Sequence, residues 1–196
     1  ENRIKSEMKE DSGEIEEYRK LGEEEAKILE NPIFIKHAGL IILNPHLRML
    51  FERCELMADG KFSDQKSQER AGHLLQYAST GPEVNEEVEA VFAKILCGLS
   101  ITDPIEKWIK LTEAERETVD GLLYAITQQW TPLSTTTVEG LRESFLQRDA
   151  KLQEDEEEFY MQVEQKSYDM LLDQLPWSVG MVKLSWMTKR IVTEWR

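Results

Sequence analysis

Apolar residues recur at helical spacing through most of the chain, and capping residues, glycine and proline bound these stretches. Thr112 and Glu115 form the pattern of a capping box, in which each residue satisfies the other's free backbone N–H group. Ser63 is expected to cap another helix, and Asp59-Gly60 to form a turn before it. The predicted helices cover residues 46–57, 63–79, 85–98 and 112–130, and a further one begins at Thr137.

Two neighbouring segments carry almost no polar residues. They are Ile33-Phe34-Ile35 and residues 38–43, and both are apolar on all sides. Such a pattern requires burial, but periodicity alone leaves open whether each segment is a strand or a helix.

The pattern changes to a period of two near residue 160. Phe159, Met161 and Val163 alternate with polar residues, which predicts a half-buried strand whose hairpin partner lies around Lys151 and Leu152. A short helix over residues 167–173 and strand-like patterns at 179–184 and 191–195 follow. The sequence therefore predicts a mainly α fold of the α+β class: a compact helical domain with a small antiparallel β element near its C-terminus.

Residues 1–30 differ in composition from the rest of the chain. They hold eleven acidic and six basic side chains with sparse apolar positions, which favours a solvated, acidic helical arm or linker. Asn31-Pro32 interrupts this pattern. We therefore predict two parts, an arm over residues 1–30 and a globular domain over residues 31–196.

Composition narrows the class of protein. A hydrophobic content of 40% and a charged content of 32% are typical of a globular protein with a highly charged surface. The net charge of -14 disfavours nucleic acid as a partner and suits basic ones. No apolar run is long enough to insert directly into a membrane. The chain starts at Glu1 without a leader, so we expect synthesis in the cytoplasm without a signal peptide, or an excerpt of a longer protein.

Residues with catalytic or metal-binding chemistry are scattered. Cys54 and Cys97 fit neither a disulfide scaffold nor a metal site, and we interpret both as reduced, buried thiols. The three histidines have no ligand or nucleophile at motif spacing, so core or capping roles are favoured for His37, His46 and His73. No glycine-rich phosphate loop is present either. We expect no cofactor, no metal and no enzymatic activity.

Charged residues in the last third of the chain are expected to be structural. The acidic run at residues 154–158 lacks the glycine and the spacing of a calcium loop, so a solvated turn is favoured. Arg142 and Arg148 are expected on other faces of the helix that begins at Thr137 than its inward-facing apolar residues. There each can pair with a carboxylate, and an anion site is the less favoured alternative.

The C-terminal segment is the main candidate for partner docking. Trp177, Trp186 and Trp195 lie nine residues apart, and large aromatic side chains dominate both cores and interfaces. The last twenty residues are basic on an otherwise acidic protein. We favour a core role for Trp177 and predict docking of a partner through the remaining tail residues, which are Trp186, Trp195, Lys183, Lys189 and Arg190.

An ordered series of sequence blocks extends over residues 33–195. The blocks are Ala38-Gly39-Leu40-Ile41-Ile42-Leu43, Arg70-Ala71-Gly72-His73-Leu74-Leu75-Gln76-Tyr77, Lys94-Ile95-Leu96-Cys97-Gly98, Val138-Glu139-Gly140-Leu141-Arg142-Glu143-Ser144-Phe145-Leu146-Gln147-Arg148, Tyr168-Asp169-Met170-Leu171-Leu172-Asp173 and Leu175-Pro176-Trp177-Ser178. Together they resemble the tape measure proteins of contractile injection systems, with small departures at His37, Asn44 and Asp149-Ala150. Residues 1–30 lie outside this resemblance.

The resemblance implies a structural role in a phage-tail-like particle, in which the tape measure sets the length of the inner tube. A helical arm of thirty residues spans at most ~45 Å, which is too short for a ruler. We therefore expect a terminal anchor whose partners are baseplate or spike subunits and the inner tube, and whose copies associate. The alternative is a cargo or effector-loading adaptor carried in the lumen of the tube; an enzyme ranks third.

Overall fold

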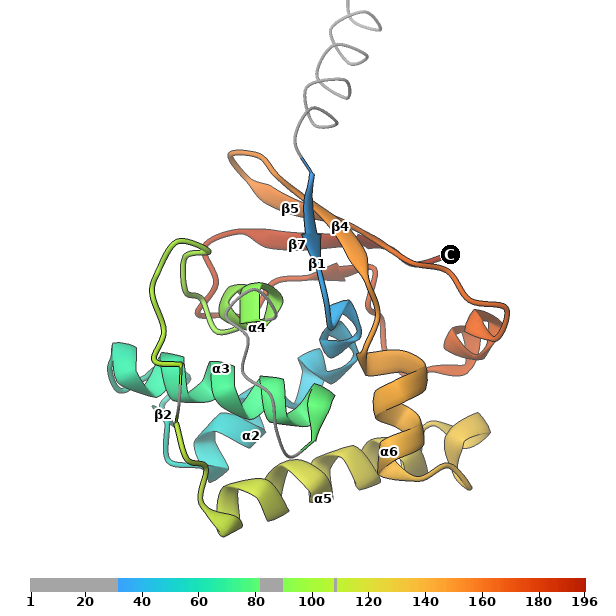
Figure 1. The fold of residues 1–196 in the computed structure, drawn as a ribbon, viewed down its shortest axis with the longest axis horizontal. Helices are drawn as coiled ribbons and strands as arrows, with labels where there is room; N and C mark the ends of the chain where they lie inside the picture. The colour runs from blue at the N-terminus through green and yellow to red at the C-terminus, as the bar shows by residue number, and fades with distance from the viewer. Residues whose placement is uncertain (1–31, 82–89, 108) are drawn as a thin grey trace, which may run out of the picture.

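A layer of helices covers one face of a five-stranded sheet (Figure 1). The computed structural model describes residues 32–81, 90–107 and 109–196. The predicted arm over residues 1–30 and the predicted cap at Asn85 lie outside the described residues. The α+β class is confirmed, because helices and a sheet pack as two layers around one core.

The sheet is larger than the sequence predicts, and its strands are of mixed orientation. Its strands, in spatial order, are β1 (Ile33–Ile35), β4 (Ala150–Glu154), β5 (Glu158–Val163), β7 (Arg190–Glu194) and β6 (Met181–Val182). The predicted hairpin is confirmed as β4 and β5, in which Leu152 faces Met161. However, β5 pairs in parallel with β7, and β1 adds a strand from the start of the domain. The prediction of a small, purely antiparallel element is therefore wrong.

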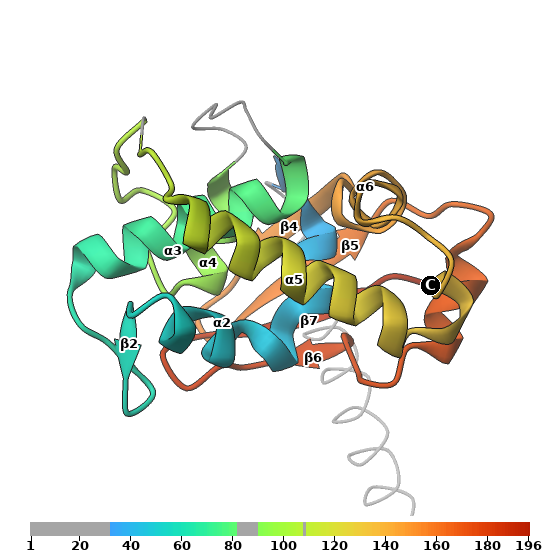
Figure 2. The same ribbon diagram turned by 90° about the horizontal axis from the view of Figure 1, so that it is seen from below.

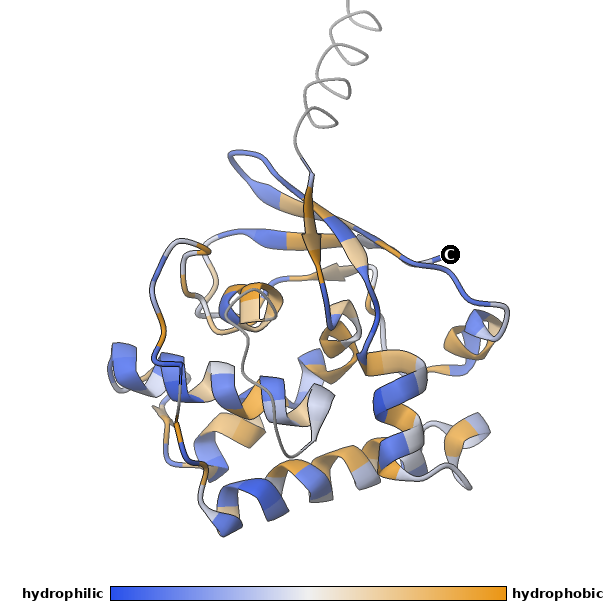
Figure 3. Cartoon of the chain, in the orientation of Figure 1, coloured by the Kyte–Doolittle hydropathy of each residue, from blue (hydrophilic) through white to orange (hydrophobic). Residues whose placement is uncertain are grey.

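The helical layer follows the predicted pattern with shorter elements. Its α-helices are α2 (Leu47–Arg53), α3 (Gln65–Thr80), α4 (Val91–Leu96), α5 (Glu113–Gln129) and α6 (Val138–Leu141). The remaining elements are η1 (Ala38–His46), η3 (Thr131–Leu133), η4 (Arg142–Leu146), η5 (Asp169–Gln174) and a hairpin of β2 (Met57–Ala58) and β3 (Lys61–Phe62). Figure 3 shows hydrophobic stretches on the inner sides of α3 and α5 and hydrophilic ones on their outer sides.

The caps of two helices test the sequence interpretation directly. The capping box of α5 is confirmed: Glu115 N–H donates to Thr112 Oγ1 at 3.2 Å, and Thr112 N–H donates to Glu115 Oε2 at 2.7 Å. For α3 the prediction of Ser63 is wrong. The cap is Asp64, whose Oδ1 accepts from Ser67 N–H at 2.7 Å. Serine and aspartate both supply an oxygen that can accept this hydrogen bond, so residue type alone does not show which of the two neighbours caps the helix.

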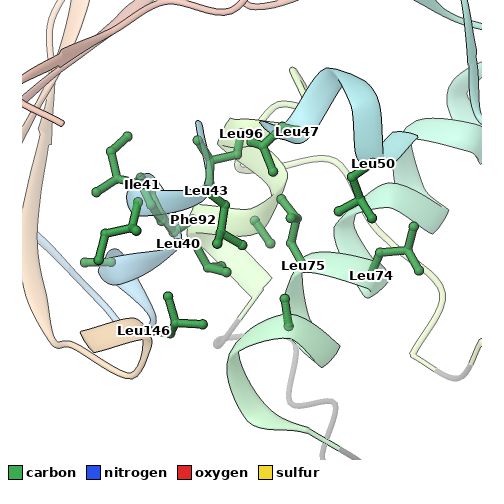
Figure 4. Packing of buried hydrophobic residues seen from close by; sticks show 14 of the residues in the cluster. Leu40, Ile41, Leu43, Leu47, Leu50, Leu74, Leu75, Phe92, Leu96 and Leu146 are labelled. Carbon is green, nitrogen blue, oxygen red and sulfur yellow. The ribbon is translucent and has the colours of Figure 1, made fainter. Parts of the chain in front are cut away.

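The apolar segment at residues 38–43 is buried at every position and forms the first part of η1, a 3₁₀ helix. Figure 4 shows Leu40, Ile41 and Leu43 beside side chains from α3 and α4. The expected burial of residues 33–35 is only partly correct. Ile35 is buried, but Ile33 is 39% and Phe34 is 70% exposed, because β1 is an edge strand.

Arg142 and Arg148 point inward, which corrects their predicted placement away from the inward-facing residues of the helix. The helix that starts at Thr137 changes to a π-helix over Arg142–Leu146, and both arginines are buried, Arg142 within this turn and Arg148 two residues after it. Arg142 Nη2 donates to Asp120 Oδ1 at 2.7 Å, and Arg148 Nη2 donates to Asp169 Oδ1 at 2.6 Å. The predicted pairing with carboxylates is thus confirmed.

Candidate functional site

The C-terminal tail, residues 175–196, crosses the domain and anchors itself through its tryptophans. Trp177 is half-buried, and its Nε1–H donates to the carbonyl oxygen of Ile42 at 2.8 Å. Its indole also meets the ring of His46 edge-on, with the ring centroids 5.0 Å apart. Trp177 therefore fastens the start of the tail to η1, in agreement with its predicted core role.

Trp186 joins the tail to the other end of the helical layer. Its Nε1–H donates to the carbonyl oxygen of Leu96 at 2.9 Å, and its ring packs against Phe51 and Phe62. Gly98 makes this approach possible, since a Cβ there would lie 2.7 Å from the backbone oxygen of Trp186. Trp186 is half-buried, so part of the indole stays at the surface.

Trp195 lies in the interior. It is 4% exposed, and the guanidinium carbon of Arg148 lies 5.6 Å from its ring centroid. Burial of an indole supplies apolar contact area and a platform for a cation. Trp130 on the opposite layer is fully buried as well, whereas Trp108 lies outside the described residues.

The basic residues of the tail pair with the acidic run at residues 154–158. Lys189 Nζ donates to Glu154 Oε1 at 2.8 Å, and Arg190 Nε donates to Glu158 Oε2 at 2.6 Å. Asp155 accepts from the N–H groups of two neighbouring residues, which holds the pKa of its carboxyl below the usual range. This acidic run is a structural turn that binds the tail. Lys183 is exposed and forms no ion pair with any described residue.

The predicted buried histidines and thiols lie in the helical layer. His37 and His73 are 6% and 3% exposed, and burial lowers the pKa of His73 and of the half-buried His46. Cys97 is buried and Cys54 half-buried, and both are free thiols. In the part of the chain that the structure describes, no three His, Cys, Asp or Glu side chains gather in a way that could hold a metal ion.

Sequence reasoning missed the apolar residues that stand on the two edges of the sheet. Phe34 on β1 is 70% exposed and Met181 on β6 is 61% exposed. The register places both on the face away from the helices, because their neighbours Ile35 and Val182 are buried. A hollow of about 790 Å³ opens beside Phe34. Two- and three-residue strands give too short an alternation for the sequence to reveal which side chain faces outward.

Comparison with protein families assigns the chain. The family model described as contractile injection system tape measure protein matches residues 1–195. The chain belongs to this family. The match begins at residue 1, so the family pattern includes residues 1–30, which the resemblance in the sequence had left outside.

The match to the tape measure family covers nearly the whole chain. Neither the curated proteins nor the solved structures provide a match. Among the residues that the structure describes, this tape measure protein has no helix that combines the length and the apolar character needed to cross a bilayer. Family membership makes it a component of a contractile, phage-tail-like particle.

Proposed function

We propose that this domain is the terminal anchor of the tape measure protein. It docks on baseplate or spike subunits and nucleates growth of the inner tube, while residues 1–30 lead toward the ruler. Family membership supports a structural, non-catalytic role in the particle. The proposed anchor role rests on one surface of the domain. We call this surface the tail edge and define it as Met181, Lys183 and Arg190.

The tail edge combines apolar and basic groups at one border of the sheet. Met181 is 61% exposed on the edge strand β6, and Lys183 follows directly after this strand. Because β6 runs antiparallel to β7, Lys183 lies at the end where Arg190 begins β7. An exposed methionine beside basic groups suits a partner surface that is apolar and acidic.

The predicted docking residues divide between two roles in this proposal. Lys183 and Arg190 contact the partner, and Trp186 contributes the part of its indole that stays at the surface. Lys189 and Trp195 have structural roles instead, because Lys189 pairs with Glu154 and Trp195 is buried beside Arg148.

Surface variants test the anchor better than a truncation. A chain ending at Gln174 lacks both β6 and β7, so β5 loses its parallel neighbour and folding itself is affected. The informative variant combines Met181→Asp with Lys183→Glu. A matched control combines Met170→Asp with Lys151→Glu, which changes an exposed methionine and an exposed lysine elsewhere.

Tube lengths in assembled particles, measured by electron microscopy, and co-purification with the baseplate give the readout. We expect the tail-edge variant to lose baseplate recruitment and to produce few tubes or tubes of irregular length, while the control assembles normally. Normal recruitment and normal tube lengths in the tail-edge variant contradict the anchor. Normal lengths together with ejection of the domain with the tube contents identify it instead as a cargo or loading adaptor.

A further inference from the structure

The helices cover one face of the sheet, and the opposite face carries exposed side chains. Figure 2 shows α2, α3 and α5 in front of the sheet, so the opposite face is turned away from the viewer. On that face Phe34 is 70% exposed, and Tyr160 and Val192 are partly exposed beside each other. We call this surface the outer face and define it as Phe34, Lys151, Tyr160, Gln162, Val192 and Glu194.

One row of the outer face holds a positive and a negative charge on either side of a neutral residue. Lys151 on β4 and Glu194 on β7 are both register partners of Gln162 on β5, so the three side chains stand at one level. All three are exposed. Neither Lys151 nor Glu194 forms an ion pair with a described residue. Each charge therefore lacks an opposite charge in the part of the chain that the structure describes.

A two-fold axis along β5 would supply the missing opposite charge to both residues. Such an axis exchanges the β4 side of the face with the β7 side, so Lys151 of one copy stands over Glu194 of the other, twice per dimer. Two sheets that pack face to face lie about 10 Å apart with their strand directions within about 30°, and side chains from both sheets fill the space between them. A lysine and a glutamate from opposite sheets can meet in this space.

An axis across the strands would use the charges less well. It would set Glu194 against Arg190, but Arg190 already binds Glu158, with 2.6 Å between Nε and Oε2. It would also set Lys151 against Asp155, whose carboxylate already accepts two N–H groups of its own turn. The axis along β5 instead joins the two charges that have no counter-charge of their own.

The polar residues near this axis are already hydrogen-bonded within one chain. The carboxylate of Glu194 accepts from the hydroxyl of Tyr160 and, at 3.2 Å, from the side-chain amide of Gln162. Burial of polar groups costs much less when they are hydrogen-bonded in this way. Tyr160 would also meet its own copy at the axis, and the aromatic ring adds apolar contact area there.

We propose that the outer face is a self-association surface, on which a second copy packs its own outer face about a two-fold axis along β5. The occupant is a second copy because the charge pattern is complementary to itself, as an isologous contact requires. The contact is separate from docking through the basic residues of the tail edge, because Arg190 begins β7 and Glu194 ends it.

Sedimentation of the full 196-residue chain over a range of concentrations tests this proposal. We expect a monomer–dimer equilibrium in the unchanged chain. Lys151→Glu sets carboxylates against each other and should weaken the dimer by more than about tenfold in dissociation constant. The control is Lys66→Glu, which changes an exposed lysine on α3 and alters the net charge equally. A chain that is monomeric at every concentration overturns the proposal, as does a dimer that both variants weaken equally.

A charge exchange tests the position of the axis. Glu194→Lys should also weaken the dimer, although it lowers the net negative charge of each copy and so reduces their general repulsion. The double variant Lys151→Glu with Glu194→Lys should restore the dimer, because opposite charges then face each other again. Failure of the double variant to recover association overturns the axis along β5.

The same variants separate self-association from the anchor role. The dimer is measured without any other component of the particle, so failure of the anchor proposal leaves this result unchanged. Lys151→Glu is also part of the control in the anchor test, and we expect that control to be monomeric and still to recruit the baseplate. A dimer that persists in Lys151→Glu but is lost in Met181→Asp places the interface at the tail edge and overturns the proposal.

Discussion

The guanidinium of Arg148 and the carboxylate of Asp169 form a two-point ion pair inside the domain. The Nη2–Oδ1 and Nη1–Oδ2 distances are 2.6 and 3.2 Å, and the two side chains are 1% and 5% exposed. The pair joins the end of the helix at η4 to η5, which begins at Asp169.

Further hydrogen bonds satisfy both members of this pair. Arg148 also donates to the carbonyl oxygens of Ser144 at 2.7 Å and Glu164 at 2.9 Å, and Asp169 accepts from the N–H of Lys166 at 2.8 Å. A buried ion pair offsets its desolvation cost only when its remaining hydrogen-bonding groups are satisfied in this way.

Removal of one partner should therefore be strongly destabilising. Asp169→Ala leaves a buried, uncompensated guanidinium, and we expect a loss of about 3–5 kcal/mol in the free energy of unfolding. Urea denaturation measures it. As a control, Asp173→Ala removes the exposed partner of Arg196 and should cost at most about 1 kcal/mol. Similar losses in both variants would show that the buried pair contributes little.

Gly39 is required by a close approach of two backbone segments. A Cβ at this position would lie 1.7 Å from the carbonyl oxygen of Phe145, so no change of rotamer relieves the overlap. We expect Gly39→Ala to destabilise the domain by more than the ~1–3 kcal/mol that overpacking usually costs. Thermal unfolding followed by circular dichroism measures this. Gly72→Ala is the control, and equal stability of the two variants would contradict the contact.

Features encoded over short stretches of sequence could be predicted. The capping box of Thr112 and Glu115, the alternation in β5 and the burial of residues 38–43 each depend on neighbours a few positions apart. For the same reason the β4–β5 hairpin was predictable, since its strands are joined by a short turn.

Features that depend on distant segments could not be predicted. The packing of the two layers determines that β5 pairs in parallel with β7 and that β1 pairs with β4. Local periodicity does not show which strands pair. The same holds for the tail, where composition drew attention to Trp195 and Lys189. Burial of Trp195 and the pairing of Lys189 with Glu154 depend on contacts more than thirty residues away in the sequence.

The capping box of α5 offers a test of local stabilisation. Thr112→Ala removes the acceptor for the N–H of Glu115, and we expect a loss of about 1 kcal/mol in the free energy of unfolding. Thr118→Ala, within the same helix, replaces a residue of lower helix propensity and should be neutral or slightly stabilising. Denaturant titration of both variants measures the free energy of unfolding. If Thr112→Ala leaves this free energy unchanged, the cap contributes nothing to stability.

His73 should make stability depend on pH. Burial lowers the pKa of its imidazole in the folded chain, although the charges of Glu69 and Glu106 act in the opposite direction. Below the ordinary pKa of about 6.5 the unfolded chain therefore binds more protons, so the free energy of unfolding falls as the pH falls.

Urea denaturation between about pH 7.5 and about pH 5.5, the range in which histidine changes charge, tests this. We expect the loss of stability on acidification to be smaller in His73→Leu than in the unchanged chain. A difference that is independent of pH would assign the effect of the substitution to packing alone.

The two thiols should be unreactive in the folded protein. Burial raises the pKa of Cys97 well above its ordinary value, and burial together with the charge of Glu115 raises the pKa of Cys54 to about 11. Because the thiolate is the reactive form, a disulfide reagent at neutral pH should modify both slowly in the native state and rapidly in denaturant. The single variants Cys54→Ser and Cys97→Ser show which modification rate belongs to which thiol.

Cys97 lies in the interior and should react only through unfolding, so its modification rate should rise with the unfolded fraction along a urea series. Fast native modification of Cys97, at a rate that urea does not change, would contradict its burial.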